Sequence, residues 1–209
     1  MVAGKNPEVP GFRTNFILYL CTTVLSFFSI DMAKPEKTIK PGFRKPETPK
    51  IKLPGNISFS PEKILISAIL LFTFLIYSGT LRNDFLIGWD DGEYLADPAV
   101  SGEGPINTSL IFSNFHLGMY QPLAILSFAV NYRISGDIAW PYILTNLLLH
   151  LLNTLLVYQL LKRWMKGYFP AAIVALLFAI HPMHVEAVAW ISTRSSGLYS
   201  LFFLLGLLA

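Results

Sequence analysis

Residues 64–81 read ILISAILLFTFLIYSGTL, an uninterrupted run of 18 residues without a charged side chain. As a helix this run would be roughly 27 Å long at about 1.5 Å per residue, close to the thickness of the hydrocarbon core of a bilayer. Composition agrees, because 53% of the residues are hydrophobic and 14% are charged, whereas soluble domains average about 25% charged residues. The run therefore predicts a membrane-spanning helix.

The two flanks of this run differ in charge. Residues 32–63 contain eight Lys or Arg and three acids, whereas residues 82–140 contain two Arg and seven acids. By the positive-inside rule the basic flank is cytoplasmic, and the acidic flank is external or lumenal. The charged residues behind the net charge of +3 are therefore distributed according to the side of the membrane on which they are predicted to lie. It indicates membrane lipid as a partner and does not predict binding to nucleic acid.

The whole chain divides into three parts. Its pattern of apolar runs predicts an all-α membrane protein, a polytopic transmembrane helix bundle. Residues 1–31 are predicted to be an extra hydrophobic segment or a leader, and residues 32–61 are predicted to be a disordered, basic, Pro- and Lys-rich cytoplasmic tail. The membrane domain, 62–209, has predicted spans at 64–81, 143–161, 164–180 and 198–209, with a long external loop at 82–140. The last run is incomplete for a span, which indicates a truncated bundle. Cys21 is the only cysteine, which excludes an intramolecular disulfide.

An acidic motif, Gly88-Trp89-Asp90-Asp91-Gly92-Glu93, follows the first predicted span. Adjacent aspartates repel each other unless a cation, a proton or a donor group compensates them. Asp91, with Asp90 as the second choice, is therefore the candidate general base that would deprotonate an acceptor hydroxyl. The alternative is an ordinary turn, since Asp-Asp-Gly is also common turn chemistry.

A second polar cluster is predicted on the same face of the membrane, at His181, His184 and Glu186. Imidazole and carboxylate groups suit several divalent metals, so a metal site is one interpretation. The favoured interpretation is a helix stop at Pro182 with positioning hydrogen bonds. A metal requirement is left unknown.

Three polar residues lie on one face of the second predicted span. Asn146, His150 and Asn153 follow i, i+4, i+7 spacing, so they form a stripe that lipid would penalise. The stripe is expected to point into the bundle. Hydrogen bonds between helices explain it, and a substrate groove would give the same pattern.

Four motifs then occur in a characteristic order: Asp90-Asp91, Tyr120-Gln121-Pro122-Leu123, residues 144–150 (LTNLLLH) and residues 181–190 (HPMHVEAVAW). Together they resemble the tetratricopeptide-repeat proteins related to transmembrane O-mannosyltransferases, in the GT-C glycosyltransferase superfamily. The resemblance covers residues 60–209, and its most specific part is His-Pro-x-His-Val-Glu.

The resemblance implies a GT-C-like membrane enzyme that moves a sugar from a polyprenyl-phosphate carrier to an acceptor hydroxyl. The carrier-linked sugar is the donor substrate, and a protein is one candidate for the acceptor. The enzyme would lie in a bacterial inner membrane or a eukaryotic membrane of the endoplasmic reticulum type. The resemblance maps a family arginine onto Arg194, and the acid often found two residues later is replaced by Ser196. Arg194, Arg133 and Arg82 are the candidate ligands of the lipid phosphate, being the basic residues predicted outside.

Two other function classes stay open. A non-catalytic membrane anchor for a downstream tetratricopeptide-repeat domain is favoured by the missing acid at Ser196. A transporter would use the stripe on the second span as its pathway, but it predicts more ionisable residues within the spans than His150.

Overall fold

The computed structural model describes residues 60–102 and 104–209, and in this part of the chain every regular element is a helix. Three helical segments are long and apolar enough to cross a membrane, at Pro61–Arg82, Trp140–Trp164 and Ile191–Leu208. The expectation of an all-α membrane protein with several spans is confirmed. The predictions for residues 1–59 lie outside the described residues.

The first span combines helix α2 (Pro61–Tyr77) with a 3-10 turn, η1 (Ser78–Arg82). Its start is set locally, because the Ser60 side chain accepts a hydrogen bond from the Lys63 amide and Pro61 occupies the first helical position, where a missing N–H costs nothing. Leu71, Phe72 and Leu75 are exposed on one side of α2, as expected of a face turned to lipid.

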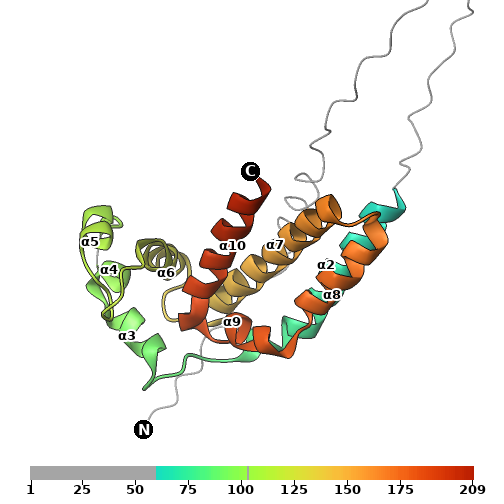
Figure 1. The fold of residues 1–209 in the computed structure, drawn as a ribbon. Coiled ribbons are helices and arrows are strands. Elements are labelled where there is room, and N and C mark those ends of the chain that lie inside the picture. The colour runs from blue at the N-terminus through green and yellow to red at the C-terminus, as the bar shows by residue number, and fades with distance from the viewer. Residues whose placement is uncertain (1–59, 103) are drawn as a thin grey trace, which may run out of the picture. The chain divides into compact units, whose positions relative to one another are not determined.

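Helix α7 (Trp140–Trp164) is the centre of the bundle. Helix α10 (Arg194–Leu208) packs along one side of it, and α8 (Tyr168–Ala179) along another, next to α2 (Figure 1). A short helix, α9 (Val185–Ala189), packs against α7 and α10 at one end. Spans far apart in the sequence are therefore held together mainly through α7.

The span predicted at 164–180 is shorter than expected. Helix α8 covers only Tyr168–Ala179, because Gly167 with φ of 101° separates it from α7. After α8 the chain continues through η2 (Pro182–His184) and α9 at a bend of 53°. Pro182 explains the break, since proline lacks the amide that a continuing helix needs. This segment is a broken span or a re-entrant loop rather than one straight helix.

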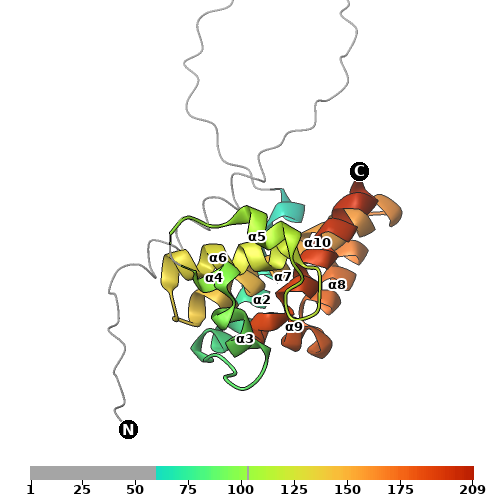
Figure 2. The ribbon, with the colours of Figure 1, turned by 90° about the vertical axis from the view of Figure 1, so that its left-hand side faces the viewer.

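The segment predicted as a long external loop is itself helical. It contains α3 (Asp90–Ala96), α4 (Pro98–Ser101), α5 (Thr108–Ser113) and α6 (Pro122–Ser135), which Figure 2 shows from their own side. Their apolar side chains share one core with the start of α7, in which Ile125, Phe128 and Tyr142 are buried. The acidic segment is thereby fixed to the first turns of α7.

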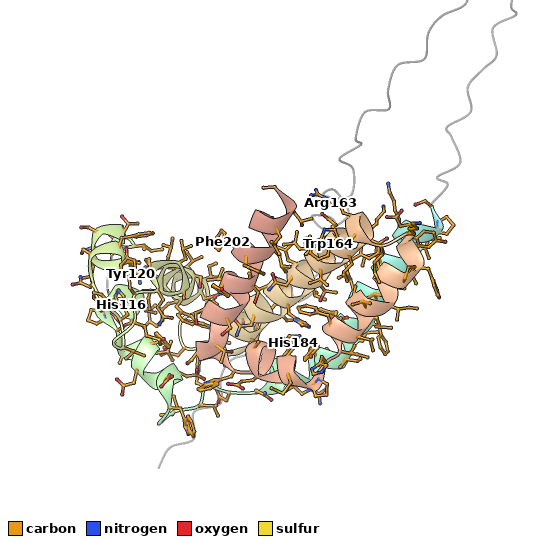
Figure 3. All side chains as sticks on the ribbon, viewed as in Figure 1. His116, Tyr120, Arg163, Trp164, His184 and Phe202 are labelled. Atoms are coloured by element: carbon orange, nitrogen blue, oxygen red, sulfur yellow. The ribbon has the colours of Figure 1, made fainter. Side chains whose placement is uncertain are left out.

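The two ends of the bundle differ chemically. Arg163 and Trp164 lie at one end and His184 at the other (Figure 3). At the basic end, the Glu62 carboxylate accepts hydrogen bonds from Tyr158 (3.0 Å) and from the Lys162 ammonium. This ties α2 to α7 on the side that the charge pattern predicts to be cytoplasmic.

Cysteine labelling tests this orientation. With Cys21 replaced by Ser, a Cys at exposed Glu93 and a Cys at exposed Trp164 are expected to react with a membrane-impermeant maleimide from opposite sides of sealed vesicles. The hydrocarbon core that separates the two ends blocks passage of the reagent. Labelling of both cysteines from one side would contradict the predicted topology.

Candidate functional site

The structure separates the roles of the two adjacent aspartates. Asp91 is only 2% exposed, and its carboxylate accepts three hydrogen bonds. One oxygen accepts the Leu86 amide at 3.0 Å, and the other accepts the Ser192 amide at 3.0 Å and the Ser192 hydroxyl. Three segments meet at this carboxylate: the loop after η1, helix α3, and η3 (Ile191–Thr193).

This arrangement compensates the Asp91 charge with amide and hydroxyl donors, as the repulsion argument requires. Both carboxylate oxygens are bonded and the side chain is buried, so a substrate hydroxyl has little access to Asp91. Its geometry is that of a residue that positions others.

Asp91→Asn is expected to lower the free energy of unfolding by about 1–3 kcal/mol. An amide cannot accept on both sides, so one of the groups from Leu86 and Ser192 loses its partner. Denaturant unfolding in detergent measures the change, with Glu93→Gln on the exposed side of α3 as the control. Equal stability of Asp91→Asn and the wild type would contradict the bonded role.

Asp90 lies in the first turn of α3 and is exposed. Beside it Trp89 is 65% exposed and packs edge to face on Trp190, with ring centroids 5.9 Å apart. The indole nitrogen of Trp190 is buried and has no hydrogen-bond partner among the described residues. An exposed carboxylate and an aromatic pair thus share one surface at the acidic end of the bundle.

Arg194 is not at this surface. Its side chain has 0% exposure, and its guanidinium donates to Asn146 Oδ1 (2.9 Å), the Tyr142 carbonyl (2.8 Å), Asn131 Oδ1 and Ser127 Oγ. It also lies over the Phe128 ring, 4.3 Å from the centroid. With its donors used internally, Arg194 cannot contact a lipid phosphate in this arrangement.

The other two predicted phosphate ligands are accessible. Arg82 is exposed at the end of η1, and Arg133 is exposed near the end of α6, where it donates to the Gly102 carbonyl. Of the three arginines, these two remain candidates for contact with a phosphate.

The histidines of the second polar cluster cap a helical turn and pack against other rings. His181 Nδ1 accepts the Met183 amide at 3.3 Å and so caps η2. The His184 ring lies 4.5 Å from the Phe178 ring and 5.4 Å from that of His150, measured between centroids. Glu186 is exposed on α9. The described residues contain no group of three or more His, Cys, Asp or Glu arranged to hold a metal.

The polar stripe of α7 bonds to other helices, as its spacing predicts. Asn146 Nδ2 donates to the Trp190 carbonyl (2.9 Å), His150 Nε2 to the Ala179 carbonyl (2.8 Å) and Asn153 Nδ2 to the Gly197 carbonyl (3.0 Å). The same three side chains line a cavity of about 510 Å³ between α7, α8, α9 and α10. The stripe therefore forms both interhelical bonds and a cavity wall.

Comparison with known proteins gives consistent relatives. The chain is 43% identical over 143 residues to protein O-mannosyl-transferase TMTC2 of Mus musculus, covering 64% of this chain and 17% of the relative. It is 38% identical over 156 residues to tmtc2 of Xenopus laevis and 31% identical over 160 residues to Tmtc1 of Drosophila melanogaster, covering 70% and 71% of this chain. The chain is homologous to the TMTC protein O-mannosyl-transferases. The resemblance inferred from the motifs is confirmed.

The homology with the TMTC proteins covers a limited part of them. The chain spans 18% of the length of the Xenopus and Drosophila relatives just named. No protein-family model matches the chain, and no solved structure matches it significantly.

Sequence reasoning missed several residues of the TMTC-like chain. Ser192, which binds Asp91, and Asn131 and Ser127, which bind Arg194, carry no motif of their own. Asn131 lies within an apolar run, and a polar side chain in such a run is a usable signal for an internal partner.

Proposed function

We propose that these helices form the membrane part of a glycosyltransferase. It moves a sugar from a polyprenyl-phosphate carrier to an acceptor hydroxyl of a protein, at the lumenal face of a membrane of the endoplasmic reticulum type. The observation that carries the proposal is the different environment of the two aspartates. Asp91 is buried and bonded internally, whereas Asp90 is exposed at the acidic end. The TMTC homology supports the reaction class and the membrane location.

In the proposed reaction Asp90 is the general base. Its carboxylate takes the proton of the acceptor hydroxyl as the acceptor oxygen forms a bond to the anomeric carbon. The bond between that carbon and the carrier phosphate breaks at the same centre, and the phosphate leaves on its lipid. Asp91 acts through Asp90, because its bonds to Leu86 and Ser192 fix the first turn of α3.

The departing phosphate needs positive charge or hydrogen-bond donors. Arg82 and Arg133 are proposed for this role because their side chains are exposed, whereas Arg194 is proposed to hold α6, α7 and α10 together. No metal ligand set is proposed.

One observation favours the alternative of a non-catalytic anchor. Arg194, the arginine that the family resemblance singles out, donates to buried acceptors, which leaves the exposed surface with acids and few cations. An anchor would need this internal network and would not need Asp90.

A reconstituted transfer assay decides between the two. The protein expressed from its complete gene, in liposomes with a radiolabelled polyprenyl-phosphate mannose and an acceptor protein, is expected to transfer the sugar. Absence of transfer from every polyprenyl-phosphate sugar supplied to well-folded protein would refute the transferase proposal and leave the anchor.

A further inference from the structure

The sequence contains two Asn-x-Ser triplets, the acceptor pattern for an N-linked glycan when x is not proline. Asn107-Thr108-Ser109 lies in the segment between the first two candidate spans, and Asn56-Ile57-Ser58 lies in the basic segment before the first span. The charge pattern predicts that the former is lumenal and the latter cytoplasmic. N-linked glycans are added on the lumenal side of the endoplasmic reticulum membrane. Of the two triplets, only the one at Asn107 is therefore expected to be an acceptor.

The backbone around Asn107 is held by apolar side chains on both sides of it. Ile106 and Leu110 pack against the core that α4, α6 and the start of α7 share, and Ile111 is fully buried. The three residues of the triplet are exposed instead. The triplet thus forms the outward side of the start of α5, the helix that Figure 2 shows above α4 and α6.

The oxygen and the nitrogen of the Asn107 side chain have different environments. Asn107 is the N-cap of α5, and its Oδ1 accepts a hydrogen bond from the Leu110 amide at 3.0 Å. Because only the oxygen can accept this bond, the cap fixes the orientation of the side-chain amide. Its Nδ2 forms no hydrogen bond with the described residues. Capping therefore uses the oxygen, and it leaves the nitrogen, to which an N-linked glycan is attached, accessible.

The third residue of the triplet is accessible as well. Ser109 is exposed, and its hydroxyl forms no hydrogen bond with the described residues. The acceptor pattern requires a hydroxyl at this position. Asn107 itself has φ of −85° and ψ of 87°, outside the helical region. The acceptor amide thus belongs to the loop before α5 rather than to the helix.

We propose that Asn107 carries an N-linked glycan on the lumenal side of the membrane. In this modification Asn107 Nδ2 loses one proton to a base of the oligosaccharyltransferase and forms a bond to the anomeric carbon of the donor, an oligosaccharide linked to a polyprenyl diphosphate. The bond between that carbon and the diphosphate oxygen breaks, and the diphosphate leaves on its lipid. This chain is the acceptor and not the catalyst. The inference shares with the proposed function only the lumenal side of the acidic segment.

A glycan at Asn107 has a consequence for the topology of the chain. A bulky, strongly polar group stays at the protein surface and cannot enter the hydrocarbon core. Once attached, it therefore holds residues 82–140 on the lumenal side while the later spans insert.

Site-specific glycan analysis tests the proposal. The protein expressed from its complete gene in animal cells is digested, and its peptides are analysed by mass spectrometry with and without peptide N-glycosidase F. The peptide that contains Asn107 is expected to carry a glycan that this enzyme removes, and the peptide that contains Asn56 is expected to carry none. An unmodified Asn107 in membrane-inserted protein would overturn the proposal.

Matched variants separate glycosylation from the capping of α5. Asn107→Asp keeps an oxygen that caps the helix and removes the amide nitrogen, so it is expected to insert normally and to lose one glycan step on a gel. Ser109→Ala leaves the cap intact and should lose the same step, whereas Ser109→Thr and Asn56→Gln should keep it. If Asn107→Asp fails to insert, the two Ser109 variants decide. Equal numbers of steps for Ser109→Ala and the wild type would refute modification at Asn107.

The outcomes of this test and of the transfer assay are independent. A glycan at Asn107 in a protein that transfers no sugar would refute the proposed function alone. Sugar transfer by a protein whose Asn107 is unmodified would refute this inference alone.

Discussion

Asp90→Asn is expected to reduce sugar transfer by about 10²- to 10⁴-fold in the protein expressed from its complete gene, without loss of membrane insertion. Asn preserves the size of the side chain and removes the group that takes the proton. Because Asp90 is exposed and its side chain forms no hydrogen bond with the described residues, its replacement should change stability by less than about 0.5 kcal/mol. The initial rate of transfer in liposomes, per folded protein, measures the effect.

Glu93→Gln is the control for this prediction, since it neutralises another exposed acid of the same helix. It should keep near wild-type activity. Asp91→Asn should differ from both, because its loss of activity would come with the loss of stability predicted from its three bonds. Wild-type transfer by Asp90→Asn would exclude Asp90 as the base.

Arg194→Met is expected to lower the free energy of unfolding by about 3–5 kcal/mol, because several buried acceptors lose their donor together. The acceptors include Asn146 Oδ1, Asn131 Oδ1 and the Tyr142 carbonyl, which belong to α6 and α7. Met keeps much of the volume, so the change isolates hydrogen bonding from packing. Denaturant unfolding in detergent measures it.

The matched control for Arg194→Met is Arg133→Met, which removes an exposed arginine from α6 and should cost less than about 1 kcal/mol. Arg194→Lys should lie between the two, since one ammonium cannot reproduce the planar guanidinium. An Arg194→Met protein as stable as the wild type would show that desolvation of the buried charge cancels its bonds.

The features that sequence predicted well are those with a strong local cause. The uncharged run 64–81 lies within the first span, and the Asn146, His150 and Asn153 spacing placed these side chains on one buried face of α7. Hydropathy and helical periodicity suffice for such statements, because lipid penalises each exposed polar group separately.

Other features depend on partners far away in the chain. The choice between Asp90 and Asp91 depends on Ser192, and the burial of Arg194 depends on Asn131 in another helix. No local pattern specifies these contacts. Hydropathy likewise registers neither the positive φ of Gly167, after which α8 begins, nor the bend at Pro182, so it predicts one straight span at 164–180 where the structure has two helical pieces.

The bond between Asp91 and Ser192 joins residues 101 positions apart. At about 5–20 residues per second, a ribosome needs roughly 5–20 s to extend the chain from one to the other. During that interval the Asp91 carboxylate is solvated and the start of α3 has no attachment to η3. The start of α3 can therefore be fixed to η3 only after the segment leading into α10 has been synthesised. This contact makes the ordering of the acidic segment depend on synthesis of the chain as far as Ser192.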